Sequence, residues 1–120
     1  MPIIKIKRVY YHPLKSDGCR ILVDLFWPRG LKKEDAIFEE WAKQLAPSER
    51  LKNWFDKDPF YWEPFRKKYR IELAQNELVN DFLERYKDRK IITLLYATTY
   101  DKLTHAIVLK EFLENCYCDI

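Results

Sequence analysis

Glycine is scarce in this sequence, with only Gly18 and Gly30 among 120 residues. Loops that bind phosphates through their backbone, such as the P-loop and the G-x-G-x-x-G turn of dinucleotide-binding folds, need several glycines within a few residues. Neither pattern is present, and the sequence also lacks the H-E-x-x-H motif of zinc proteases and the G-x-S-x-G motif of α/β-hydrolases. The scarcity of glycine excludes a glycine-rich phosphate loop, and the sequence gives no motif evidence for the other classes named.

Disulfide and membrane signals are missing as well. The three cysteines are an odd number, and the closest two, Cys116 and Cys118, have a spacing that fits neither a disulfide framework nor a zinc site. No apolar run approaches the roughly 20 residues that span a bilayer, and the alternating residues 1–5 show no cleavable signal pattern. We therefore expect a cytoplasmic protein with reduced thiols, no metal or other cofactor, and no membrane association.

Charge is distributed unevenly along the chain, whose net charge is +3. Residues 1–33 contain eight lysines and arginines against Asp17 and Asp24, a net charge of +6, so the remaining residues carry −3. A basic segment of this kind is typical of proteins that bind a small anion or a nucleic acid. A solvated face with ordinary lysines is nevertheless the favoured interpretation.

The hydrophobic pattern predicts strands and helices within one domain, residues 1–120. Residues 19–26 and 90–97 have the apolar runs of strands that are buried on both faces, and residues 3–9 alternate like a half-exposed strand. Apolar residues at helical spacing, together with start signals such as Ser48 and Asp58-Pro59, predict several helices. The predicted helices are 34–46, 48–56, 63–74, 76–87 and 105–114.

The order of these elements predicts the topology. The long helical crossover between 19–26 and 90–97 favours parallel strands, whereas the loop after residues 3–9 is too short to make the first two strands parallel neighbours. The last helix is apolar on most sides and should be buried, and residues 116–118 add a few strand-like residues. The predicted fold class is α/β: a small single-domain sheet with at least two parallel central strands, a helical insertion between them and a buried C-terminal helix.

Polar residues gather where the two buried strands end. Those after the first strand are Asp24 and Arg29, and those after the second are Tyr96, Thr98, Asp101, Thr104 and His105. Because ligands of open α/β sheets lie outside the carboxyl ends of the strands, we expect these groups to converge on a site.

Each residue of this site has a predicted role. Asp24 and His105 form a catalytic acid–base pair, and Arg29 holds a phosphate or carboxylate. Tyr96, Thr98 and Thr104 complete the ligand-binding set, near the N-terminus of the last helix. In the alternative interpretation, Asp24 caps the turn near Arg29 and His105 caps its own helix. The sequence leaves both open.

A cluster of aromatic residues raises a second functional hypothesis. Seven aromatic residues between positions 54 and 69 are interleaved with lysines and arginines, as in surfaces that stack the bases of single-stranded nucleic acids. Trp54, Phe55, Phe65 and Tyr69 also lie at the spacing of a helix core. Core packing is the favoured interpretation, so these four side chains are predicted to be largely buried.

Four segments carry a family resemblance: DGCRILVDLFWPRG (17–30), LAPSERLKNWF (45–55), DPFYWEPFRKKYRIEL (58–73) and ITLLYATTYDKLTHAIVLKEFL (92–113). Together they resemble the YeaO-like branch of domain-of-unknown-function family 488. By this resemblance, Asp24, Pro28 and Arg29 match a strand that ends D-V-R-x-x-P-R, and His105 matches the histidine of a later Cys-His-Arg motif. The resemblance implies a compact α/β domain and no particular activity.

This chain departs from the family pattern at three places. Leu25 stands where the pattern has arginine, Lys57 stands where a histidine before Asp-Pro is common, and residues 100–104 lack the usual acidic, histidine and asparagine residues. If the family is enzymatic, these departures predict an altered or inactive member.

Three functions therefore remain open. The best supported is a small enzyme or ligand-binding domain for an anionic, phosphate- or nucleotide-like molecule at the carboxyl ends of strands 19–26 and 90–97. The second is a nucleic-acid-associated module that uses the basic N-terminal third together with Arg66, Lys67 and Arg70. The third is an interaction protein whose Trp and Tyr residues form a homodimer surface.

Overall fold

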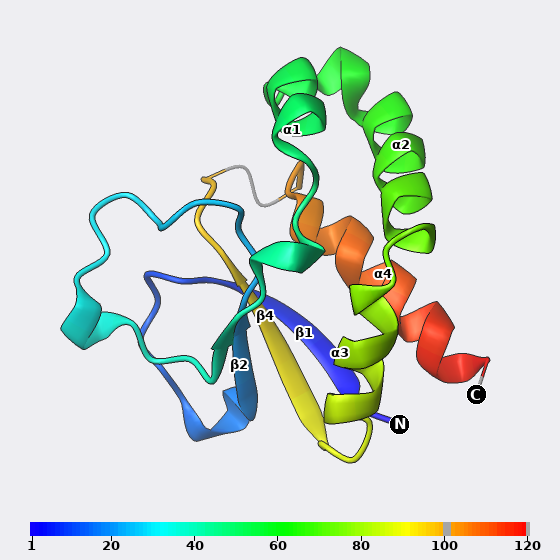
Figure 1. Cartoon of the computed structure of the whole chain (residues 1–120). Helices are drawn as coiled ribbons and strands as arrows, with labels where there is room; N and C mark the ends of the chain where they lie inside the picture. Colours follow the sequence, from blue (N-terminus) through cyan, green and yellow to red (C-terminus); the bar gives the residue numbers. More distant parts are fainter. Residues whose placement is uncertain (100–101, 120) are drawn as a thin grey trace.

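A parallel sheet of four strands forms the centre of the protein (Figure 1). The structure is a computed structural model and describes residues 1–99 and 102–119. The strands lie in the order β1-β4-β2-β3, and their bounds are β1 Ile3–Arg8, β2 Cys19–Leu22, β3 Glu40–Trp41 and β4 Ile91–Tyr96. The two buried strands are parallel neighbours, as predicted. The first two strands are separated by β4, which confirms that they are not neighbours.

The register of the sheet brings three strand ends to one edge. Arg8 at the end of β1 pairs with Tyr96 at the end of β4, and Leu22 at the end of β2 pairs with Leu95. The ladder continues one step further through a hydrogen bond from the Val23 N–H to the Leu95 carbonyl at 3.0 Å. The residues that follow these strands therefore begin side by side.

Four α-helices follow β3 and flank β4 in the chain: α1 Glu49–Phe55, α2 Trp62–Ala74, α3 Leu78–Tyr86 and α4 His105–Cys118. The predicted capping residues Ser48 and Asp58 form the expected hydrogen bonds. Ser48 Oγ accepts the Leu51 N–H at 3.2 Å, and Asp58 accepts the Phe60 N–H at 3.0 Å ahead of the turn at Pro59–Tyr61. The predicted helices at 48–56, 63–74 and 76–87 are confirmed with small shifts of their ends.

The predicted helix at 34–46 is wrong. This segment forms 3₁₀ turns at Lys33–Asp35 and Lys43–Leu45 on either side of the short strand β3. Its backbone N–H groups are used by β2 instead: Glu39 N donates to the Arg20 carbonyl at 2.8 Å and Ala42 N to the Leu22 carbonyl at 2.7 Å. Hydrogen bonding to the open edge of β2 therefore outweighs the helix preference that the spacing of the apolar residues indicates.

The C-terminal residues also differ from the prediction. Residues 116–118 are not strand-like, because α4 continues to Cys118. Tyr117 explains the extension: its side chain is buried against α3, and its hydroxyl donates to the Leu83 carbonyl at 3.1 Å. The predicted burial of this helix is confirmed, since Ala106, Val108, Leu109 and Leu113 are fully buried.

The helices and one long connection cover opposite faces of the sheet (Figure 1). The larger core packs Ile21, Val23, Ile92 and Leu94 against the helices. A smaller core on the other face contains Val9, Leu22 and Leu95, covered by the partly buried Leu31, Phe38 and Trp41 of the segment after β2. The segment after β2 therefore acts as a second layer and carries Arg29.

The prediction for the aromatic cluster is correct for three of its four core residues. Phe55, Phe65 and Tyr69 are buried, but the side chain of Trp54 is 42% exposed. The short helix α1 buries only Leu51 and Phe55, which are four residues apart, so Trp54 lies beside this stripe and packs on Tyr61 with ring centroids 4.9 Å apart. In the described part of the chain, no helix is long and apolar enough to cross a membrane.

Candidate functional site

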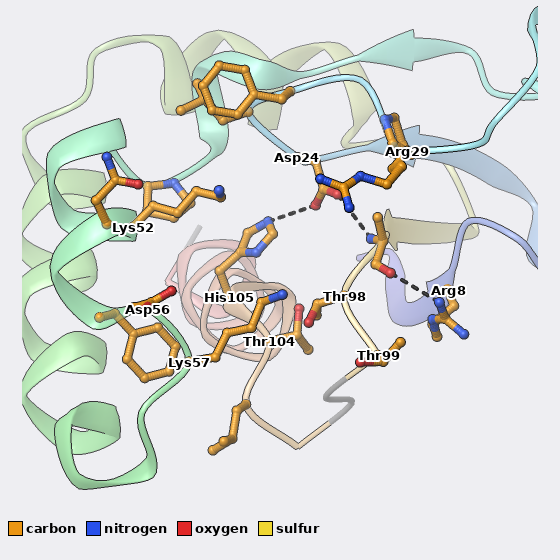
Figure 2. Close-up of a pocket in the computed structure, with 18 of the residues that line it drawn as sticks. Arg8, Asp24, Arg29, Lys52, Asp56, Lys57, Thr98, Thr99, Thr104 and His105 are labelled. Atoms are coloured by element: carbon orange, nitrogen blue, oxygen red, sulfur yellow. Dashed lines mark hydrogen bonds and ion pairs between the residues drawn. The ribbon is translucent and has the colours of Figure 1, made fainter.

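A cavity of about 650 Å³ lies at the carboxyl ends of β1, β2 and β4 (Figure 2). Its walls are the strand ends, the loop after β2, α1 with the turn that follows it, and the start of α4. The charged side chains among the described lining residues are Arg8, Asp24, Arg29, Lys52, Asp56, Lys57 and His105. The predicted convergence of the strand ends on one site is thus seen, with additional cations from α1 and β1.

Asp24 bridges the ends of two strands. It follows Val23 directly, and its Oδ2 accepts the N–H of Ala97, the residue after β4, at 3.0 Å. Its Oδ1 is buried and has no hydrogen-bond partner among the described residues. Burial raises the pKa of Asp24 above its ordinary value, and the charges of His105, Lys52 and Lys57 oppose this rise. A carboxylate in this position is costly to ionise without a cation nearby.

His105 is the first residue of α4 and reaches back to the end of β2. Its Nε2 lies 2.9 Å from the Val23 carbonyl oxygen and 3.4 Å from Asp24 Oδ1. The ring points toward Asp24 (Figure 2) and packs against Tyr69, with ring centroids 6.2 Å apart. The pair is therefore close enough for proton exchange through a direct contact or one water molecule.

Both parts of the capping alternative are at odds with the geometry. Asp24 accepts the Ala97 N–H at 3.0 Å, across the sheet from the turn near Arg29. The cap of α4 is Thr104, whose Oγ1 accepts the Ala106 N–H at 3.2 Å. The side chains of Asp24 and His105 are thus engaged with each other and with the strand ends.

The other predicted site residues differ in whether they line the cavity. Arg29 is exposed at the cavity rim, where its carbonyl accepts the Tyr10 hydroxyl at 2.6 Å, and Thr98 also lines the cavity. Thr104 lines the cavity, but its hydroxyl serves as the helix cap. Tyr96 is 4% exposed and lies in the core outside the cavity lining. Asp101 lies outside the described residues.

The sequence reasoning missed four charged residues of the lining. Lys52 and Asp56 are one helical turn apart at the end of α1, and Lys57 follows them. Arg8 ends β1, donates to the Ala97 carbonyl at 3.2 Å and stacks on Tyr10 with its guanidinium carbon 5.1 Å from the ring centroid. The sequence did contain a signal for Lys52. It directly follows Leu51, a buried residue of α1, so its side chain lies beside the buried stripe of that helix.

Lys57 is held by an unusual backbone conformation. Asp56 and Lys57 have φ angles of 44° and 58°, in the left-handed region that glycine usually occupies. Such a conformation costs a non-glycine residue roughly 1–2 kcal/mol. Conformational strain of this kind clusters at functional sites, and here it ends α1 and brings the Lys57 side chain to the cavity (Figure 2).

Among the described residues, no group of three or more His, Cys, Asp or Glu side chains is placed to hold a metal ion. The part of the cavity lining that the structure describes instead combines four permanent cations, two carboxylates and one histidine. Permanent positive charges thus outnumber negative ones among these described residues, and the apolar part of the wall includes Phe26, Trp27 and Phe55.

Fold and site together define the class of protein: a parallel α/β domain with a cation-lined cavity where its strands end. A family model described as the inactive DUF488-N3 subclade matches residues 3–119, and the chain belongs to this family. The predicted YeaO-like relationship is confirmed by "Uncharacterized protein YeaO" of Escherichia coli (strain K12), which is 40% identical over 112 residues, or 93% of this chain and 97% of the relative.

A more distant relative has the same extent. "Uncharacterized protein Rv3073c" of Mycobacterium tuberculosis is 33% identical over 112 residues, which cover 93% of this chain and 94% of the relative. No solved structure matches the chain.

Proposed function

We propose that the protein is a binding domain for a small anionic molecule, phosphate- or nucleotide-like, at the carboxyl ends of β2 and β4. The observation that carries this proposal is the charge of the cavity. Among the described lining residues, the four cations Arg8, Arg29, Lys52 and Lys57 stand against two carboxylates, and one of these, Asp24, already faces His105. Positive charge in a concave site raises the local concentration of anions and favours their binding.

The size and walls of the cavity support a ligand larger than a bare ion. A volume of about 650 Å³ lies within the range of small-molecule sites. Phe26 and Trp27 line one side and offer aromatic faces to an organic part of the ligand. Lys52 also lies over Phe26, with its Nζ 5.4 Å from the ring centroid, so charge and apolar surface adjoin.

Binding is favoured over catalysis by the family and by two residues of this chain. The family is described as inactive, and Leu25 and Lys57 stand where the YeaO-like pattern has arginine and commonly histidine. In this proposal Asp24 and His105 orient the ligand and contribute charge to the site. Their acid–base role in a reaction remains a separate prediction.

The proposal is tested by titrating the protein with sulfate, inorganic phosphate and adenosine monophosphate while recording backbone amide resonances by NMR. We expect shifts at residues 24–29, 97–99 and 104–106. Arg29→Lys keeps the charge but loses the two-pronged guanidinium geometry, so binding should weaken by about tenfold, or roughly 1.4 kcal/mol. Arg50→Lys, on the exposed surface of α1 outside the cavity lining, is the matched control. Absence of shifts at these residues with all three anions contradicts the proposal.

A second function is favoured by one observation, the exposure of aromatic residues at α1 and the turn after it. Trp54 is 42% and Phe60 is 81% exposed, and the Lys68 Nζ lies 5.2 Å from the Trp54 ring centroid. This arrangement supports stacking of single-stranded nucleic acid. It is weakened by the N-terminal third, where Lys7 and Arg20 are both ion-paired with Asp17 and are therefore not directed at a ligand. A steep loss of RNA or DNA binding with added salt would favour it, whereas a mass that rises with concentration would favour the homodimer.

A further inference from the structure

The hydrogen-bond partner of His105 fixes where its ring carries hydrogen. The Val23 carbonyl oxygen, 2.9 Å from Nε2, can only accept a hydrogen bond. Nε2 must therefore carry the hydrogen, and in neutral His105 the other nitrogen, Nδ1, holds a lone pair. No group in residues 1–99 and 102–119 hydrogen-bonds to Nδ1. Because His105 lines the cavity, Nδ1 is the ring nitrogen left for a ligand.

A lone pair on Nδ1 repels an anion, whereas an N–H at the same position binds one. The neutral ring therefore presents the wrong group to the ligand class that the cavity's cations favour. Addition of a proton to Nδ1 reverses this: the ring becomes a cation that donates from both nitrogens. Nε2 keeps its hydrogen bond to the Val23 carbonyl, and the ring, which now carries a positive charge, faces Asp24 Oδ1, 3.4 Å from Nε2.

The charged groups around His105 have opposing effects on this proton. Asp24 favours it directly, and Asp56, at the end of α1, adds a second carboxylate. Tyr69 on α2 is neutral, because burial raises its pKa well above the ordinary value. The cations that oppose the proton are those of the cavity: Arg8, Arg29, Lys52 and Lys57. An anion bound among these cations would offset their repulsion and so favour the proton on His105.

We propose that the site takes up a proton together with its anion, with His105 Nδ1 as the acceptor and Asp24 as the counter-charge. The proposal rests on the anion-binding function above and specifies how the site is regulated. One proton comes from solvent and forms the Nδ1–H bond, no bond breaks within the protein, and the new N–H donates to the anion. Affinity then falls as pH rises, by at most about tenfold per pH unit for one linked proton.

The test uses sulfate, which stays fully ionised over the range of about pH 6–8 in which histidines exchange protons. Calorimetric titrations at one pH in two buffers with different ionisation enthalpies give the number of protons taken up. We expect an uptake above zero and of at most one proton per sulfate, and a dissociation constant that is larger at pH 8 than at pH 6. The wild-type protein supplies both measurements.

Two variants assign the proton to His105. His105→Gln cannot take up the proton, so its sulfate affinity should be weak and independent of pH. His12→Gln, the same change at the other histidine, which is exposed and outside the cavity lining, should keep the wild-type pH dependence. If His105→Gln does not fold, nitrogen NMR of the wild-type ring gives the same assignment, because ligand-free His105 should be the Nε2–H tautomer and should gain a hydrogen at Nδ1 with sulfate.

The outcomes separate the two proposals. Sulfate binding that is independent of pH, without proton uptake, overturns the proton-linked mechanism and leaves the anion site intact. An Nδ1–H tautomer in the free protein also overturns the mechanism. The absence of any sulfate binding at pH 6, where all the groups are most positive, overturns the anion-binding function itself.

Discussion

The Oδ1 atom of Asp24 lies 3.4 Å from Nε2 of His105 and is buried without a hydrogen-bond partner among the described residues. Its second oxygen is held by the Ala97 N–H. The parallel pairing of β2 with β4 produces this relationship, because Asp24 follows β2 and α4 follows β4. An ionised carboxylate with one unbonded buried oxygen lowers stability at neutral pH.

Asp24→Asn should therefore stabilise the protein at pH 7, by roughly 0.5–2 kcal/mol, the usual gain when a functional site is relieved of an unfavourable group. Burial raises the pKa of Asp24 above its ordinary 3.8, so the folded state holds this proton more tightly than the unfolded chain. Stability consequently falls as pH rises above 3.8, and the advantage of the variant should shrink in acid. Urea unfolding at pH 7 and pH 4 measures this difference.

The control for this prediction is Asp56→Asn. Asp56 also lines the cavity but is exposed, and asparagine tolerates its left-handed backbone, so stability should change little at either pH. A loss of stability in Asp24→Asn at pH 7 would show that the Asp24 charge stabilises the folded state.

The contribution of Glu40 to the free energy of unfolding should depend on pH in the opposite direction. It accepts hydrogen bonds from Arg85 Nη1 and from the Tyr86 hydroxyl, each at 2.7 Å, and the Arg85 guanidinium lowers the pKa of Glu40 to about 2. A lowered pKa adds stability above the ordinary value of 4.5, and this stability is lost as pH falls toward about 2.

Glu40→Gln should cost roughly 1–3 kcal/mol at pH 7, the range for hydrogen bonds to a charged group, and much less at pH 3. Urea unfolding at the two pH values checks this. Glu34→Gln, at an exposed position without an ion pair in the part of the chain that the structure describes, is the control and should have no effect. An equal cost at both pH values would contradict the assignment.

The sequence predicted those features of the fold that depend on runs of apolar residues along the chain. The apolar runs around Ile21 and Leu94 identified the two parallel strands, and the rule that strand ends share an edge brought Asp24 and His105 together. By contrast, β3 has only two residues, and its hydrogen bonds depend on the open edge of β2, which no local pattern reveals. Lys57 was missed as a site residue because its left-handed backbone has no glycine or asparagine to signal it.

Trp54 and Phe65 provide a comparison within the aromatic cluster. If Trp54 were buried as the sequence predicted, Trp54→Ala would cost roughly 3–5 kcal/mol, the value for a buried aromatic residue. Because Trp54 is 42% exposed, we now expect a cost of about 1 kcal/mol, whereas Phe65→Ala, at 2% exposure and stacked on Phe55, should cost roughly 3–5 kcal/mol. Chemical denaturation of both variants tests the difference. Equal losses would mean that Trp54 is part of the core.

The two glycines should respond differently to alanine. Both have positive φ angles, 62° for Gly18 and 78° for Gly30. A Cβ at Gly18 would lie 2.6 Å from the Ile91 carbonyl oxygen, but one at Gly30 would meet nothing within 4 Å. Gly30→Ala should therefore cost only the backbone strain of roughly 1–2 kcal/mol. Gly18→Ala should cost clearly more, and a smaller loss for Gly18→Ala in thermal unfolding would contradict the close approach of β4.

Substitutions in the strained turn after α1, residues 56–57, should affect the stability of the protein and its affinity for sulfate separately. Lys57→Gly removes the strain at a φ of 58°, so the protein should gain roughly 0.5–1 kcal/mol of stability. It also removes a cation from the cavity lining, so sulfate binding at pH 6 should weaken several-fold.

Asp56→Gly is the matched control, because it relieves the neighbouring left-handed residue but removes a negative charge. It should raise stability by a similar amount and strengthen sulfate binding. Thermal unfolding and calorimetry on the same two variants give both quantities. If both variants bind sulfate equally, the turn stabilises no anion and its strain has another origin; if the affinities move in opposite directions, the turn serves to hold the Lys57 charge at the site.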